Sequence, residues 1–111
     1  MIRIILGALS LCVSSTSLAA GSVDAKVIQV RIDQDGKGMV IFDRPIGGTP
    51  PSCVIAAYAN ALAFGNTPAG RAVMAMALTA KSTGNTVTAY GLGTCAVFGS
   101  YAEDWNYGVV Q

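Results

Sequence analysis

A short segment near the end of the sequence holds most of the side chains that suit ligand binding. Tyr101, Trp105 and Tyr107 fall within seven residues, together with Asp104 and Asn106. Tyrosine and tryptophan offer an apolar ring face with a polar edge, and Asp and Asn side chains form hydrogen bonds. These five residues are therefore candidates for binding a glycan or a peptide.

Each of these residues also has an interpretation as part of the packing. In a strand, Trp105 and Tyr107 would share one face and Asn106 would lie on the other. Packing in the core is favoured for Trp105, with Tyr107 beside it. For Tyr101 and Asp104, expected on the loop before the strand, packing and ligand contact both stay open.

Few residues of the chain suit catalysis. The sequence of 111 residues contains no histidine, which excludes the Ser-His-Asp triad and zinc sites with His ligands. A glycosidase needs two carboxyl groups facing each other across a cleft, and a domain of this size seldom has such a cleft. The serines and threonines have only lysines or carboxylates as possible bases. We therefore expect a non-enzymatic protein without a cofactor.

The turn around Asp33 and Asp35 raises the question of a calcium site, because an EF-hand loop begins with a similar spacing of aspartates. However, Lys37 replaces a ligand, and Arg44 stands where the closing glutamate belongs. An Asp-Gly turn between two apolar runs predicts a β-hairpin instead. No metal site is expected.

The N-terminal segment is typical of a secretory signal peptide over residues 1–19. Arg3 supplies the positive charge, Ile4–Val13 is a short apolar run, and small residues precede a cleavage point after Ala19. The apolar run is too short to span a bilayer, which needs about 20 residues. We therefore predict export to the periplasm or beyond the cell.

The predicted export decides how the three cysteines of the sequence are interpreted. A lipidated Cys12 would give a membrane anchor, but the large residue before it argues against lipidation, and no anchor is expected. Cys53 and Cys95 remain in an oxidising compartment and are predicted to form a disulfide. A redox pair or a metal site is the alternative, although catalytic dithiols usually lie two residues apart and zinc prefers four ligands.

The remaining residues, 20–111, are expected to form one domain. Charged residues make up 12% of the sequence, about half the usual ~25%, and hydrophobic residues 52%, which excludes intrinsic disorder. Residues 20–111 contain six basic and six acidic residues, hence a net charge of zero. Nucleic acids and anionic membranes require clustered lysines and arginines, so neither is expected as a partner.

Alternating and continuous apolar runs predict five strands. In the first, Ile28, Val30 and Ile32 are expected on one face of a half-buried strand. Asn60–Phe64 either ends the third strand or forms an irregular connection. The predicted strands are Val27–Ile32, Met39–Phe42, Cys53–Tyr58, Thr86–Leu92 and Trp105–Val110.

One helix is predicted from Ala69 to Ser82. Thr67 suits the N-cap, Pro68 the first helical position and Gly84 the left-handed C-cap. The middle turns are apolar on all sides, which is typical of a helix buried on more than one face. A homo-oligomer interface is therefore one interpretation, and tolerance of alanine in water is the other. The candidate interface residues are Val73, Met74, Met76 and Leu78.

This order of elements predicts a mainly β fold with one helix, a small five-stranded OB-like barrel (β-β-β-α-β-β) with one disulfide. The disulfide would join the start of the third strand to the end of the fourth. Several strings resemble a group of short exported bacterial proteins, a resemblance that brings no activity with it. These strings are Asp35–Gly38, Phe42–Pro45, Cys53, Ala61–Phe64, Ala77–Ala80 and Gly93–Cys95.

More remotely, the layout resembles the B subunits of subtilase cytotoxin and pertussis-like toxins. The resemblance lies in size, export, cystine and strand order, and it implies a pentamer that binds cell-surface glycans. No glycan-binding residue of those toxins matches a position here. We therefore expect an exported binding module for a glycan or protein that oligomerises in the manner of a toxin B subunit. The alternative is a monomeric periplasmic inhibitor or structural or stress-related factor, and a small hydrolase comes third.

Overall fold

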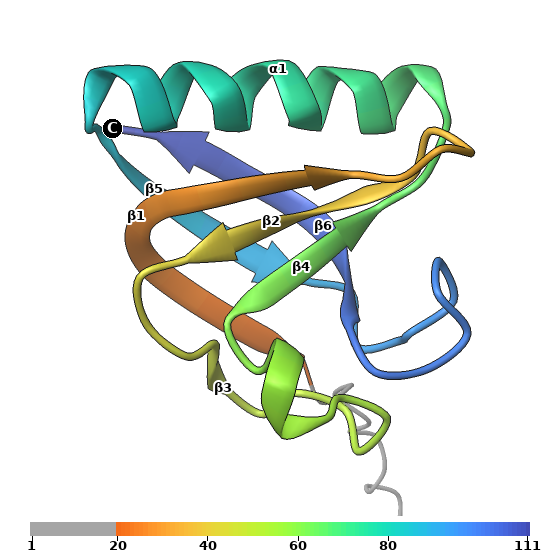
Figure 1. Cartoon of the computed structure of the whole chain (residues 1–111). Coiled ribbons are helices and arrows are strands. Elements are labelled where there is room, and N and C mark those ends of the chain that lie inside the picture. Colours follow the sequence, from red (N-terminus) through yellow and green to blue (C-terminus); the bar gives the residue numbers. More distant parts are fainter. Residues whose placement is uncertain (1–19) are drawn as a thin grey trace, which may run out of the picture.

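A computed structural model describes residues 20–111 as a small barrel with one long helix (Figure 1). The predicted signal peptide and Cys12 lie outside the described residues. The strands of the barrel are β1 (Gly21–Ile32), β2 (Gly38–Phe42), β4 (Ala61–Phe64), β5 (Thr86–Gly91) and β6 (Glu103–Val110). The other elements are β3 (Gly47–Gly48), the short 3-10 helix η2 (Ala56–Tyr58) and α1 (Pro68–Thr83).

The barrel is closed in the order β1-β2-β4-β6-β5, and β5 returns to β1. The pairing of β4 with β6 is parallel, whereas the other neighbours in the barrel are antiparallel. The helix α1 lies between β4 and β5 in the chain. The predicted OB-like barrel is therefore confirmed, including the place of its helix.

The first strand is longer than predicted and begins at Gly21 rather than Val27. Val23, Ala25 and Val27 point into the core, an alternation that is visible in the sequence. A β-bulge between Val27 and Gln29 then interrupts this alternation. As a result, Ile28 and Ile32 are about half exposed and only Val30 of the expected apolar face packs against the core.

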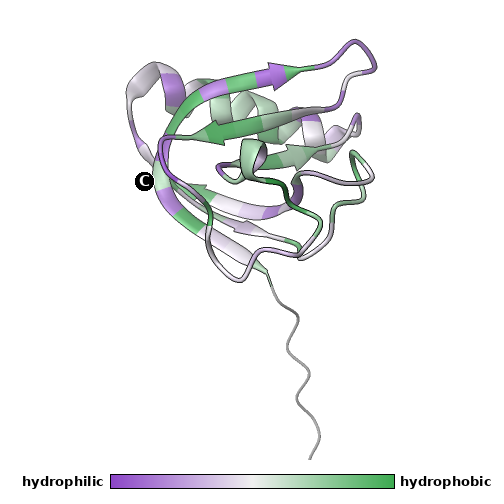
Figure 2. Cartoon of the chain, turned by 60° about the horizontal axis from the view of Figure 1, so that its bottom comes forward, coloured by the Kyte–Doolittle hydropathy of each residue, from purple (hydrophilic) through white to green (hydrophobic). Residues whose placement is uncertain are grey.

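The third strand of the barrel is Ala61–Phe64, so the prediction of a strand at Cys53–Tyr58 is wrong. The segment from Cys53 to Tyr58 is a loop that contains η2. All four residues of β4 are buried, because Leu62 and Phe64 face the barrel core while Ala61 and Ala63 are covered from outside. Figure 2 shows strongly hydrophobic residues on strands and also in loops, whereas the β1–β2 turn is hydrophilic.

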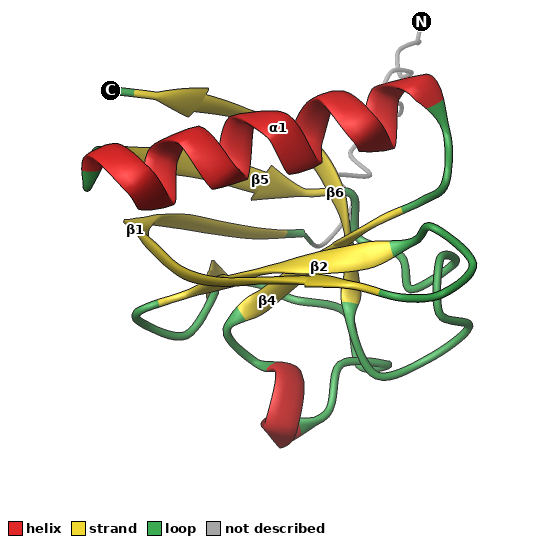
Figure 3. Ribbon diagram, turned by 45° about the horizontal axis from the view of Figure 1, so that its top comes forward, coloured by secondary structure: helices red, strands yellow, loops and turns green. Residues whose placement is uncertain are grey.

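The helix α1 has the ends that the sequence predicts and lies across one end of the barrel (Figure 3). The hydroxyl of Thr67 accepts a hydrogen bond from the backbone N–H of Gly70 at 2.9 Å. Gly84 adopts the left-handed conformation with a φ of 74°, and its N–H donates to the Ala80 carbonyl. No helix within residues 20–111 is long and apolar enough to cross a membrane.

The residues expected at an oligomer interface lie on two sides of this helix. Val73, Met74 and Met76 pack against the core of the barrel. Leu78 is 45% exposed. The other exposed residues of α1 include alanines such as Ala72 and polar residues such as Arg71 and Thr79.

A second layer covers the outside of β2 and β4. Met39, Ala61 and Ala63 are buried there, and Tyr58 and Tyr101 pack against them. These covering residues belong to two loops, residues 49–60 before β4 and residues 92–102 between β5 and β6.

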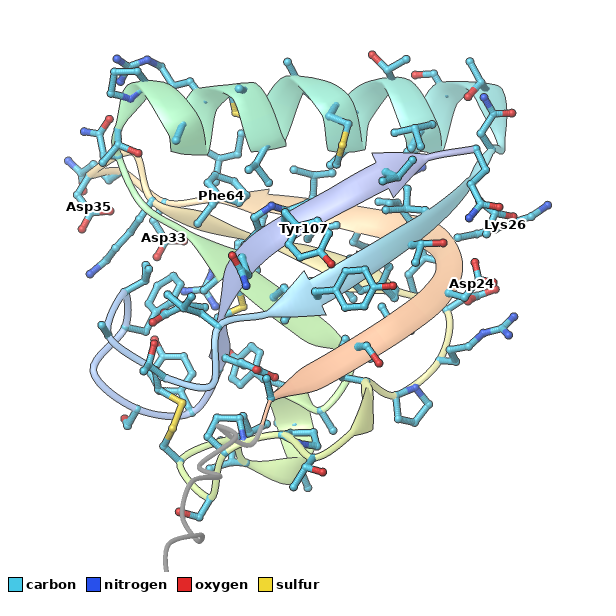
Figure 4. All side chains as sticks on the ribbon, turned by 180° about the vertical axis from the view of Figure 1, so that it is seen from behind. Asp24, Lys26, Asp33, Asp35, Phe64 and Tyr107 are labelled. Atoms are coloured by element: carbon cyan, nitrogen blue, oxygen red, sulfur yellow. A yellow bond between two sulfur atoms is a disulfide. The ribbon has the colours of Figure 1, made fainter. Side chains whose placement is uncertain are left out.

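The predicted disulfide between Cys53 and Cys95 is confirmed, with a Cα–Cα distance of 6.3 Å. It joins the two covering loops, whereas the prediction placed it between two strands. Figure 4 shows the disulfide far from α1, at the other end of the molecule. The bond indicates an oxidising, extracytoplasmic setting.

Candidate functional site

A groove opens in the barrel wall where β4 and β6 separate. The two strands pair only at Leu62 with Glu103 and at Ala63 with Asp104. Beyond these pairs, the groove has a volume of about 380 Å³. Its walls are the end of β4, the first turns of α1, the loop after β5 and the start of β6.

A second β-bulge shapes the wall of the groove on β6. Tyr90 pairs with Tyr107 and Gly91 with Trp105, so Asn106 is the extra residue between them. Neighbouring residues of a regular strand point to opposite faces, but a bulge redirects one of them. Trp105 and Asn106 therefore both line the groove. The expectation that Trp105 shares a face with Tyr107 is wrong, because the bulge separates the two residues in the pairing with β5. A bulge of this kind is not visible as a break in the sequence pattern.

Trp105 belongs both to the core and to the groove. The residue is partly buried and packs against the core cluster of the barrel, as its packing interpretation expects. Its indole ring covers Gly108, where a β-carbon would lie 2.7 Å from Cζ2 of the tryptophan. The glycine thus provides the space in which the indole ring lies, and Trp105 remains part of the groove wall.

Asp104 lines the groove, but its carboxylate is bound within the protein. The backbone N–H groups of Ala96 and Val97 donate to its two oxygens at 2.7 and 2.9 Å, and the Thr94 hydroxyl also donates. The residue is 4% exposed. Asp104 therefore holds the loop that forms one wall of the groove.

The structure places Tyr101 and Tyr107 outside the groove. Tyr107 is 53% exposed on the outer face of the barrel, where its ring stacks on Tyr90 at a centroid distance of 4.5 Å (Figure 4). Tyr101 belongs to the covering layer, with its ring 5.0 Å from that of Tyr58. Its φ of 66° lies in the left-handed region, and its N–H donates to the Cys53 carbonyl. Of the five candidate residues, Asp104, Trp105 and Asn106 come together.

The face by which OB-like barrels commonly bind oligonucleotides and oligosaccharides is covered in this protein. That face lies over the second and third strands of the barrel, here β2 and β4. The covering loop is attached to the β1–β2 hairpin by Arg31 and Lys37, whose charged groups lie 5.3 and 5.0 Å from the ring centroid of Phe98. The groove beside Trp105 therefore lies at a different place from this face.

The β1–β2 turn is the predicted hairpin. The carboxylate of Asp33 accepts two hydrogen bonds from Arg31, which raise the pKa of the guanidinium further above its usual range. The Lys37 ammonium lies 3.5 Å from the Asp35 carboxylate. Within residues 20–111, no group of three or more potential metal-ligating side chains is close enough to hold an ion.

Sequence reasoning missed Glu103, which is 1% exposed at the start of β6. Its Oε2 accepts hydrogen bonds from the backbone N–H groups of Gly21 and Gly93 at 3.0 and 2.9 Å. A β-carbon at Gly91 would overlap the carboxylate. The nearby glycines are a signal for a close approach, but the sequence does not show which side chain approaches them.

Comparisons of the chain with protein-family models, with curated proteins and with solved structures find no match. Of the resemblance to toxin B subunits, the structure supports the fold alone. The chain is a small five-stranded mixed β-barrel with one disulfide.

Proposed function

We propose that this protein is an exported, non-enzymatic binding module that holds a glycan in the groove beside Trp105. The observation that carries the proposal is the groove itself, a hollow of about 380 Å³ with an aromatic wall and a neighbouring exposed amide. Pockets for small ligands are commonly about 300–1,000 Å³ and combine apolar walls with a few polar groups.

The chemistry of the walls favours a sugar. A sugar ring has apolar C–H faces and a rim of hydroxyl groups. Trp105, Val73 and Leu92 offer apolar surface to such a face, and the Asn106 amide can donate to and accept from hydroxyl groups. The β-bulge supports this proposal because it puts the indole and the amide side by side.

The polar groups of the groove suit binding better than catalysis. The Asp104 carboxylate already accepts three internal hydrogen bonds, and the Thr67 hydroxyl accepts one from the Gly70 N–H. General acid–base catalysis needs a titratable group within hydrogen-bond reach of the substrate. In this groove the carboxylate instead fixes the position of a wall.

The disulfide and the predicted signal peptide together support a place in the periplasm or outside the cell. A second candidate function is a monomeric periplasmic inhibitor or structural factor. The packing of Val73, Met74 and Met76 on their own barrel favours this candidate, since a partner is not needed to cover them. A toxin-like oligomer would have to use the exposed residues around Leu78. Light scattering distinguishes the mass of one chain from that of several.

The glycan proposal is tested by blocking the groove from the side of α1, so that the groove residues of β4 and β6 stay unchanged. Ala69 is exposed and lines the groove, so Ala69→Trp puts a large ring into it. Ala75→Trp is the matched control, because Ala75 is also exposed on α1 but does not line the groove. On an array of immobilised glycans, we expect the wild type and Ala75→Trp to bind the same glycans and Ala69→Trp to lose at least tenfold in signal. Absence of binding by the wild type, or equal binding by both variants, contradicts the proposal.

A further inference from the structure

Glu103 is a buried carboxylate with half of its hydrogen-bonding capacity unused. Its Oε2 accepts two backbone N–H groups, but no donor within residues 20–111 reaches Oε1. A buried charge is costly unless it is paired and hydrogen-bonded. Its surroundings therefore call for a positive group or a further donor.

No cationic side chain of the described residues fills this role. The ion pairs among residues 20–111 are Arg31 with Asp33, Lys37 with Asp35 and Arg44 with Asp43. The carboxylate instead faces the beginning of β1, where a β-carbon on Gly21 would lie 2.6 Å from Oε1. Figure 1 shows that this start of β1 lies at the end of the barrel away from α1.

The residue before Gly21 is the one that predicted signal-peptide cleavage would make N-terminal. The Gly21 nitrogen lies 3.0 Å from Oε2 of Glu103, and the Ala20 nitrogen is one residue further along the backbone, within about 3.8 Å of the Gly21 nitrogen. Cleavage after Ala19 converts the Ala20 amide into a free ammonium. The Ala20 carbonyl accepts a hydrogen bond from Thr49 at 3.0 Å, which keeps this end of the chain at the barrel.

We propose that Glu103 is the binding site for the protein's own mature N-terminus, and that the Ala20 ammonium formed by cleavage supplies the charge that the buried carboxylate lacks. The peptide bond between Ala19 and Ala20 is hydrolysed, so one water is consumed and a carboxylate leaves with the signal peptide. The new ammonium remains on residues 20–111. Gly21 and Gly91 leave the space in which the carboxylate and the chain end meet. Export would thereby complete the fold, independently of any ligand in the groove.

The test compares protein that begins at Ala20 with protein that carries three further residues, Ser17–Ala19, before it. The matched control carries the same three residues after Gln111, which is exposed. At pH 6.5 an α-amino group is charged. We expect the N-terminal extension to lower Tm by about 5 °C or more and the C-terminal extension to leave it unchanged, since ~1 kcal/mol shifts Tm by about 4–8 °C in a domain of this size.

Glu103→Gln identifies the partner of the ammonium. In this variant the two N-terminal forms should have the same Tm, because the carboxylate with which the Ala20 ammonium pairs is gone. If both extensions alter the wild type equally, or if Glu103→Gln keeps the full difference, the proposal is overturned.

Should Glu103→Gln not fold, the reactivity of the Ala20 amine in the wild type gives a separate test. An amine-directed reagent should modify this amine at least tenfold more slowly in the native protein than in urea, while the exposed Lys26 reacts at similar rates in both. Equal reactivity of Ala20 in the two states would rule out the pairing.

Discussion

The helix α1 and the two disulfide-linked loops cover different sides of the same barrel by different means. The helix packs aliphatic side chains against the inside, and its ends are fixed by Thr67 and Gly84 within their own sequence neighbourhood. The loops cover the outside of β2 and β4 with aromatic rings and are tied together by Cys53 and Cys95, 42 residues apart. One covering layer depends on local sequence, and the other depends on contacts between distant segments.

The difference bears on where a ligand can bind. Because the loops cover the outer face of β2 and β4, a ligand has to bind elsewhere, and the split between β4 and β6 offers a groove for it. Both layers contribute to that groove, since the first turns of α1 form one wall and the loop held by Asp104 forms the opposite one. Changes in either layer should therefore have distinguishable effects.

The largest effect is expected from removing the disulfide. Loss of a cross-link that closes a loop of this length should lower the free energy of unfolding by about 4 kcal/mol in the chain-entropy model. Urea unfolding of Cys53→Ser with Cys95→Ser measures this loss. Amide exchange should increase first in residues 49–60 and 92–102 and last in α1. Equal acceleration in both layers would contradict the comparison.

A smaller effect is expected at the anchors of the two layers. Asp104→Asn removes a charged acceptor of three hydrogen bonds and should cost about 2 kcal/mol of unfolding free energy. Thr67→Ala removes the helix N-cap and should cost about 1 kcal/mol. Urea unfolding of both variants gives the order. A greater loss in Thr67→Ala would show that the helix, rather than the loop, is the more dependent layer.

Tyr101 tests the backbone of the covering loop. A residue other than glycine in the left-handed region costs roughly 1–2 kcal/mol. Tyr101→Gly and Tyr101→Ala both lose the ring contacts, so their comparison isolates the backbone. We expect the glycine variant to be more stable by about 1 kcal/mol in thermal unfolding. The reverse order would mean that this conformation carries no cost.

The smallest effect is expected at Asp43, which follows β2 outside both layers. The hydrogen bond from the Arg44 guanidinium, with help from the Lys26 backbone N–H, holds the pKa of Asp43 below its usual range. The folded state thus favours the charged form, and the stabilisation is present above the ordinary Asp pKa of about 3.9 and lost as the pH falls through the lower value. Asp43→Asn should have a slightly lower Tm than the wild type at pH 7 and the same Tm near pH ~2. A difference that grows toward low pH would reverse this assignment.

The elements of the fold that depend on neighbouring residues in the sequence could be predicted from the sequence. The caps of α1, the β1–β2 hairpin, the succession of three strands, one helix and two strands along the chain, and the disulfide all follow from short-range patterns or from a pair of cysteines in an oxidising compartment. The third strand was misplaced because Cys53–Tyr58 and Ala61–Phe64 are both apolar runs, and only tertiary packing shows which one the barrel takes.

The candidate site was predictable only in part, because some of its features depend on pairing between segments that are far apart in the sequence. Aromatic and polar residues in one segment pointed to Trp105 and Asn106, but the bulge that brings them together arises from pairing with β5. The sequence leaves packing and ligand contact open for Asp104 and assigns no role to Glu103. Their carboxylates accept hydrogen bonds from backbone N–H groups outside their own strand, from Gly21 to Glu103 and from Ala96 to Asp104.

The central claim, that ligand binds in the groove rather than on the covered face, is tested most directly by NMR. The chain has a single tryptophan, so the indole N–H of Trp105 is an unambiguous probe. On addition of a glycan retained on the array, we predict shifts of this signal and of the amides of Ala69, Leu92 and Asn106, with Tyr58 and Tyr101 unchanged. Shifts confined to Tyr58, Phe98 and Tyr101 would contradict the account and place the ligand over β2 and β4.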